Sequence, residues 1–228
     1  MLNYSPHAMT SESASNVKIV GHKKEVEFAR RVNGDVVGKT SKPDVIKDQY
    51  RYSIKGALVN IQLFLLSFQK SEKVYGFNSP LYNYQLAAYN YRKFKYDNGI
   101  EDRDLFSKFL VAADNLATWL KNKHNFRSVI EKVCSDGYDA NKLVVLKDIE
   151  QDALVYDMKE VVDLYTNSNY NVHVTDGAKI VIRVDNEEIF FIETRGSKGK
   201  IGSMNHGCRA PQFYSFLQKN LTCDIISR

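Results

Sequence analysis

The sequence predicts an α/β fold of the α+β kind, in which a mixed central sheet is flanked by helices and the middle of the chain is largely helical. Three observations predict it. A helical pattern is followed by two strand patterns before residue 56, helical spacing dominates residues 80–165, and the last third returns to alternating strand patterns around a tight turn. The length of 228 residues fits a single domain with a full core.

The chain divides into four regions. Residues 1–16 are rich in Ser, Asn and Thr and are expected to form a flexible N-terminal arm without the apolar run of a signal peptide. Residues 17–70 form the predicted catalytic core, residues 80–165 the helical region, and residues 170–228 a strand hairpin with a basic segment. No apolar run reaches membrane-spanning length, so we expect no membrane partner.

The composition is that of an ordinary globular protein. Thirty-two Lys and Arg against 27 Asp and Glu give a net charge of +5, which permits nucleic-acid binding without requiring it. The three cysteines, Cys134, Cys208 and Cys223, are odd in number and form no CxxC pair. A reducing cytoplasm is therefore the expected location.

The first helical pattern, residues 22–33, carries one carboxylate on its apolar face. Positions 25, 28, 29 and 32 share a face, so Glu25 lies beside Phe28 and Val32. A carboxylate there is costly unless something pairs with it or is coordinated by it. Glu25 is therefore a candidate functional residue.

Two strand patterns follow, at residues 43–46 and 50–55, around a polar turn at residues 47–49. Folding this hairpin about its middle places Asp44 opposite either Ser53 or Lys55. Alternation sends Tyr50, Tyr52 and Ile54 to one face of the second strand, and Arg51, Ser53 and Lys55 to the other. A carboxylate and an ammonium group thus converge. Mg²⁺ is usually held by one or two carboxylates together with phosphate oxygens, and a neighbouring Lys can orient or deprotonate water.

Four pieces of sequence carry a resemblance to a known family. They are GHKKE at residues 21–25, GKT followed by PDV at residues 38–45, YSIKG at residues 52–56 and QLFL at residues 62–65. Here the chain resembles the type II restriction endonucleases of the PD-(D/E)xK nuclease superfamily, over roughly the first 70 residues. The resemblance implies a restriction-endonuclease-like core and sequence-specific, Mg²⁺-dependent cleavage of double-stranded DNA within a restriction-modification system. For a palindromic target it implies a homodimer.

The resemblance also implies roles for individual residues. Asp44 would be the principal metal ligand, assisted by the main-chain carbonyl of Ile54, and Lys55 would be the catalytic lysine. Glu25 would be the acidic residue contributed by the first helix, near the metal. Ser53 stands where the family pattern has Asp or Glu, so Glu25 would compensate directly or through water.

The helical middle is expected to be scaffold. Helices are predicted at residues 81–96, 101–122, 126–134 and 151–165, with a short strand at residues 143–146. The apolar run at residues 57–68 fits a buried helix or a buried strand, with Gln62 as a hydrogen-bonded core amide.

The last third ends in a basic segment. Residues 179–184 and 187–194 alternate as strands around Asp185-Asn186, and residues 194–223 contain five Lys or Arg and no acidic residue. Glycines in this segment allow close approach to phosphate, and Arg, Lys, Asn and Gln can read base edges. We therefore predict that residues 195–212 contact DNA. The candidate contact residues are Arg195, Lys198, Lys200, Asn205, His206, Arg209 and Gln212.

Several alternatives stay open from the sequence. The basic segment also fits a flexible surface loop. A second catalytic placement combines Asp176 or Asp185 with Glu193-Thr194-Arg195, although Arg stays protonated and is a poor base. The serine at position 53 keeps open a non-catalytic DNA-binding protein with a nuclease-like core. A structure-specific repair nuclease, cutting without a fixed sequence, is a third reading.

Overall fold

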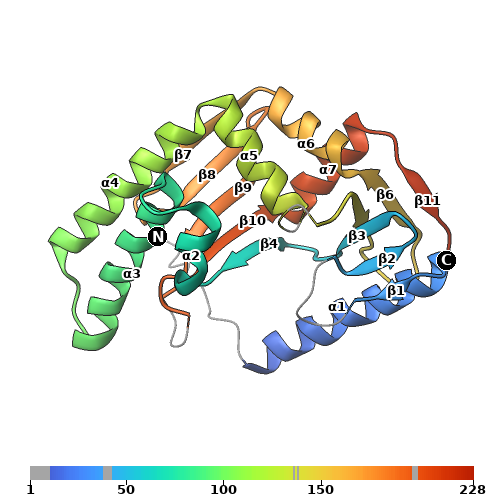
Figure 1. Ribbon diagram of the computed structural model, residues 1–228, viewed down its shortest axis with the longest axis horizontal. Helices are drawn as coiled ribbons and strands as arrows, with labels where there is room; N and C mark the ends of the chain where they lie inside the picture. Colours follow the sequence, from blue (N-terminus) through green and yellow to red (C-terminus); the bar gives the residue numbers. More distant parts are fainter. Residues whose placement is uncertain (1–10, 38–42, 136, 138, 197–199) are drawn as a thin grey trace, which may run out of the picture.

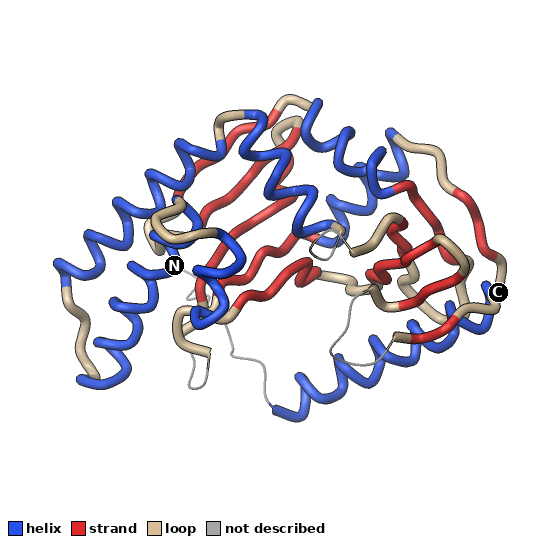
Figure 2. The backbone as a smooth tube through the Cα atoms, in the orientation of Figure 1, coloured by secondary structure: helices blue, strands red, loops and turns tan. Residues whose placement is uncertain are grey.

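The computed structural model describes residues 11–37, 43–135, 137, 139–196 and 200–228. Within these residues the chain forms seven helices and two β-sheets, which confirms the α+β fold class (Figures 1 and 2). The strands are divided between one mixed and one antiparallel sheet. No helix in these ranges is long and apolar enough to span a bilayer.

The first sheet is mixed and carries the candidate catalytic residues. Its order is β1 (Asp35–Val36), β2 (Val45–Lys47), β3 (Tyr50–Lys55), β5 (Lys142–Val145), β6 (Ala153–Asp157) and β11 (Asp224–Ile226). β3 and β5 run parallel, and the other neighbours are antiparallel. The predicted hairpin at residues 43–55 and the predicted strand at residues 143–146 are therefore confirmed, with boundaries shifted by one or two residues.

The second sheet is antiparallel throughout. Its order is β4 (Asn60–Leu66), β10 (Met204–Arg209), β9 (Glu187–Thr194), β8 (Ile180–Val184) and β7 (Tyr170–Val174). β8 and β9 form the predicted hairpin, and both turn residues, Asp185 and Asn186, have positive φ. Such φ values suit the tight hairpin turns that Asn and Asp tolerate.

α1 (Ser11–Val32) covers one face of the first sheet, and the ring centroids of Phe28 and Tyr52 lie 5.0 Å apart. The remaining helices lie on one side of the second sheet, with α5 drawn in front of its strands in Figure 1, and α6 also packs against β5 and β6 of the first sheet. They are α2 (Phe68–Tyr75), α3 (Pro80–Asn98), α4 (Arg103–Leu120), α5 (Lys123–Cys134), α6 (Met158–Asn167) and α7 (Ala210–Asn220). Side chains of Ser79, Asp102, Asn122 and Asp157 cap α3, α4, α5 and α6.

Two apolar clusters confirm the alternation predicted for β3. Tyr52 and Ile54 belong to the smaller cluster under α1, together with Val144 of β5. Leu143 and Val145, which pair with Ser53 and Lys55, belong to the large core on the opposite face. Ser53 and Lys55 therefore point away from α1 and toward the large core.

Three predictions from the sequence need correction. Residues 11–16, assigned to the flexible arm, belong to α1, and residues 1–10 lie outside the described ranges. Residues 151–165, predicted as one helix, contain β6 before α6, because an apolar strand precedes the capping residue Asp157. The run at residues 57–68 resolves into strand β4, in which Gln62 is exposed and is not a core amide.

Candidate active site

The β2–β3 hairpin brings Asp44 beside Ser53. The backbone N–H of Asp44 donates to the carbonyl of Tyr52 at 2.9 Å, and the Asp44 carboxylate accepts from the backbone N–H of Ile54 at 2.7 Å. These two contacts bracket Ser53. Of the two registers that the sequence allowed, Asp44 therefore lies opposite Ser53 and not opposite Lys55.

Lys55 and Ser53 are enclosed. Ser53 is fully buried, and Lys55 is 9% exposed at the end of β3. Burial raises the pKa of the Cys208 thiol in β10, and the positive charge of Lys55 opposes that rise. The ammonium group of Lys55 is therefore close to β10, where the two sheets meet.

The Asp44 carboxylate and the main-chain carbonyl of Ile54 lie on the same side of β3. The N–H and C=O of one strand residue point the same way, and the Ile54 N–H points to Asp44, so the Ile54 carbonyl also points toward the β2 side. The next carbonyl, that of Lys55, accepts from Leu146 on the β5 side. The Asp44 carboxylate and the Ile54 carbonyl thus form the kind of oxygen donor set that suits Mg²⁺, which keeps several waters and needs few protein ligands.

The side chain of Glu25 contacts His22, a residue of its own helix. Its side chain, 28% exposed, lies 3.1 Å from His22 Nδ1 on the same helix. α1 covers the Tyr52 face of β3, whereas Lys55 takes the other face. The placement of Glu25 near Asp44 and Lys55 stays a prediction. The helical face of Glu25 was correctly placed, because Phe28 and Ala29 are buried, but its polar partner is a histidine.

A half-buried lysine near the site, Lys24, escaped the sequence reasoning. Lys24 Nζ donates to the carbonyl oxygens of Gly56, at 2.7 Å, and Lys147, at 2.6 Å. These carbonyls follow the carboxyl ends of the parallel strands β3 and β5. Burial lowers the pKa of Lys24, and the charge of Asp148 counteracts this. Lys24 thus ties both strand ends together next to Lys55, and no pattern in the sequence distinguishes it from Lys23.

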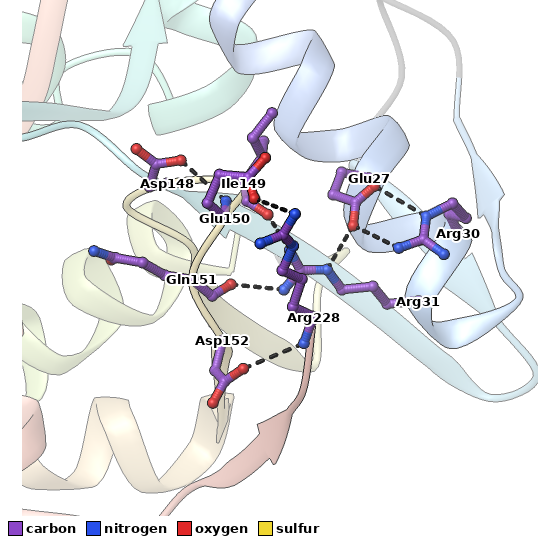
Figure 3. Close-up of polar contacts among 9 residues, drawn as sticks. All are labelled: Glu27, Arg30, Arg31, Asp148, Ile149, Glu150, Gln151, Asp152 and Arg228. Carbon is purple, nitrogen blue, oxygen red and sulfur yellow. Dashed lines mark hydrogen bonds and ion pairs between the residues drawn. The ribbon is translucent and has the colours of Figure 1, made fainter.

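Further polar contacts fix α1 to the loop between β5 and β6 (Figure 3). Arg31 donates to the main-chain carbonyls of Ile149 and Gln151 and to the carboxylate of Glu27. Hydrogen bonds from Arg30 and Arg31 lower the pKa of Glu27 to about 2. The helix is therefore held against the end of the sheet at which Lys55 lies.

The predicted DNA-contact segment is not a single surface loop. Residues 204–209 form β10, which lies between β4 and β9, and Gln212 lies in the first turn of α7. Arg195 donates from its backbone to Ser203, which closes the base of the connection into β10. Lys200 is exposed, and Lys198 lies outside the described residues. The signal for this strand is the alternation of Met204, His206 and Cys208 on one face with Asn205, Gly207 and Arg209 on the other.

Two of the predicted DNA-contact residues in β10, His206 and Asn205, are buried, which corrects their predicted role. His206 is 2% exposed and contacts the hydroxyl of Tyr75 on the helix side, and burial lowers its pKa to about 4. It has no surface through which to contact DNA. Asn205 is 4% exposed, and its side-chain nitrogen donates to the carboxylate of Glu193 at 3.1 Å.

Arg195 and Arg209 reach the surface on the side of the second sheet away from the helices. Arg195 donates to Gln62 at 2.9 Å, and Arg209 contacts Glu188 and Asn60. The rival catalytic placement is not assembled from Asp185, because Asp185 lies in the β8–β9 turn, at the opposite end of β9 from Glu193.

Among the described residues, no group of three or more His, Cys, Asp and Glu side chains could hold a metal ion. A metal would therefore rely on the single carboxylate of Asp44, main-chain oxygen, water and substrate. No protein-family model matches this chain, and no curated protein matches it.

Proposed function

We propose that the chain is a sequence-specific type II restriction endonuclease that hydrolyses phosphodiester bonds of double-stranded DNA with Mg²⁺. The observation that supports this function is the hydrogen bond between the Asp44 carboxylate and the Ile54 N–H, which brings Asp44 to the strand end that carries Lys55, in the chain order of the family pattern apart from Ser53. Cytoplasmic location and membership of a restriction-modification system are parts of the same proposal.

The residues present fit Mg²⁺ through Asp44 and the Ile54 carbonyl. When bound, the ion would stabilise negative charge on the scissile phosphate. Asp44 holds its carboxylate in place through the Ile54 N–H, so this oxygen pair is set by the backbone. Lys55, enclosed at the strand end, would orient the attacking water and move its proton. Ser53 contributes no charge, which limits the protein's direct anionic ligands to Asp44.

A twofold homodimer would place two such sites on the two strands of a palindromic target. Each subunit would then cut one strand, and the cutting pattern on duplex DNA would be symmetric.

A non-catalytic DNA-binding protein is the second candidate. It is favoured by the serine at position 53 and by the single carboxylate found at this site. Binding alone needs positive and polar surface groups but neither Asp44 nor Lys55.

The test is digestion of a long, mapped duplex DNA with Mg²⁺ by the wild type and by Asp44→Asn and Lys55→Met. Asparagine retains an oxygen that can accept from Ile54 N–H, and methionine retains an apolar stem, so both variants are designed to fold. Asp48→Asn and Lys47→Met, at exposed or half-exposed positions of the same hairpin, are matched controls.

Discrete Mg²⁺-dependent bands that are lost in Asp44→Asn and Lys55→Met but kept in the controls would support the proposal. Bands that persist in both site variants would contradict this site assignment. A smear would favour a repair nuclease. Intact DNA that is nevertheless retarded on a gel would favour the binding protein.

A further inference from the structure

One face of the second sheet is left without a helix by the described part of the chain. The helices α2 to α7 contact the face that carries Leu63, Ile192 and Met204. Figure 1 shows this layering, with the strands behind the helices. The opposite face, which we name the outer polar face, consists of the alternate residues of β4, β10, β9 and β8.

Contacts between neighbouring strands join the residues of the outer polar face. Lys179, beside β8, lies 4.0 Å from Glu193 of β9, which in turn accepts from Asn205 of β10. On β4, Gln62 accepts from Arg195, and Asn60 accepts from Arg209. The members of the outer polar face are Asn60, Gln62, Leu65, Lys179, Val181, Arg183, Glu188, Phe191, Glu193, Arg195, Asn205, Gly207 and Arg209.

At the centre of the outer polar face, the ring of Phe191 makes cation–π contacts with Lys179 and Arg209. Phe191 packs over Gly207, where any Cβ would meet the ring at 2.4 Å. Lys179 Nζ lies 4.2 Å and Arg209 Cζ 5.5 Å from the ring centroid of Phe191. Phe191 therefore supports two cations whose stems cover it and whose charged ends remain partly exposed.

The charge on this face favours an anionic partner. Four basic side chains, Lys179, Arg183, Arg195 and Arg209, lie on this face with two carboxylates, Glu188 and Glu193. Burial and then the charge of Arg209 lower the pKa of Lys179, and the two carboxylates only partly offset this. An added phosphate would relieve that repulsion.

The face also lies close to the candidate active site. β4 begins at Asn60, five residues after Lys55, which is at most about 18 Å of extended chain. The Val59 carbonyl accepts from Ala210 at 2.9 Å, so Arg209 stands at that same end of the sheet. The strand end that carries Lys55 therefore lies near the end of the outer polar face that carries Arg209.

We propose that the outer polar face docks duplex DNA, with Lys179 and Arg209 on phosphates and Arg195, oriented by Gln62, on a base edge. Arg is the commonest side chain for reading guanine, and a neighbour that fixes its guanidinium lowers the cost of that contact. Lys179, Gln62 and Asn60 are additions to the predicted contact residues. The inference rests on the proposed function for its choice of duplex DNA as ligand.

Binding can be measured apart from cleavage in the Asp44→Asn background. The probe is a fluorescent random-sequence duplex of about 30 base pairs, with affinity measured by anisotropy across a salt series. Lys179→Gln is expected to weaken binding several-fold and to reduce the slope of log affinity against log salt by about 1. Lys219→Gln, at an exposed position near the end of α7, is the matched control and should bind as the parent does.

Arg195→Gln tests the base contact. Sequences enriched by the parent from a random library should lose about tenfold or more of their preference over unselected duplex in this variant. Parent-like affinity in Lys179→Gln, parent-like preference in Arg195→Gln, or no duplex binding by the parent would each overturn the proposal. If the wild type cuts DNA while Lys179→Gln and Arg195→Gln bind it as the parent does, the docking surface is rejected and the nuclease function stands. If binding follows these expectations but the wild type does not cut DNA, the docking surface stands and the nuclease function is rejected.

Discussion

The ammonium group of Lys24 lies 2.7 Å from the carbonyl oxygen of Gly56, at the point where the chain leaves β3. A helix that covers one face of the first sheet thereby reaches around the strand end that carries Lys55 on its other face. The second carbonyl partner, Lys147, follows β5, so one side chain joins two parallel strands whose connection spans most of the helical region. The position of the candidate catalytic lysine thus depends on a residue far from it in sequence.

Lys24→Met is expected to lower the free energy of unfolding by about 2 kcal/mol, because two half-buried carbonyls lose a charged donor. Urea unfolding followed by circular dichroism measures this change. Lys23→Met, at the exposed neighbouring position, is the control and should lie within about 0.5 kcal/mol of the wild type. Equal stability in the two variants would show that the strand ends do not need this donor.

Gly56→Ala is expected to be more harmful than Lys24→Met. A Cβ at position 56 would lie 2.2 Å from the Leu146 carbonyl oxygen and 2.7 Å from Lys24 Nζ, so backbone must shift. We expect a loss of about 3 kcal/mol or failure to fold. Gly21→Ala, within α1 and with nothing within 4 Å of the added carbon, should instead stabilise by up to about 1 kcal/mol. Thermal unfolding of both variants measures these changes. If Gly56→Ala were as stable as the wild type, the packing described for this strand end would be contradicted.

His206 makes stability depend on pH. Its pKa is about 4 in the folded chain against 6.5 ordinarily, so below pH 6.5 the unfolded chain takes up a proton that the folded chain refuses. Stability should therefore fall as pH drops from 6.5 toward 4, by about 2 kcal/mol at pH 5 from this residue. His206→Gln should remove that part of the pH dependence, whereas His124→Gln at an exposed position should not. The free energy of unfolding is measured by urea titration at pH 8 and at pH 5. The same loss between these two pH values in all three proteins would refute the assignment.

The sequence predicts local features of this molecule better than its long-range ones. The Asp44 to Lys55 hairpin and the Asp185-Asn186 turn are confirmed because alternation and turn chemistry are decided within a dozen residues. The division into two sheets depends on β4 pairing with β10, a contact across more than 130 residues that no local pattern encodes. For the same reason the sequence analysis predicts a DNA-contacting segment at residues 195–212 but no strand within it, whereas Met204 and Cys208 of β10 lie in the core.

The β8–β9 turn offers a test of the scaffold that carries Lys179 and Glu193. Asp185 and Asn186 have φ of 48° and 69°, a left-handed conformation that Asn and Gly tolerate and that a β-branched side chain does not. Asn186→Gly should leave the free energy of unfolding within about 0.5 kcal/mol of the wild type, and Asn186→Val should lower it by about 1 to 2 kcal/mol. Glu187→Val, one residue later at the exposed start of β9, controls for the added apolar group. If Asn186→Val matched Glu187→Val in urea unfolding, the positive φ at position 186 would carry no energetic weight, and the hairpin would be held by its strand pairing alone.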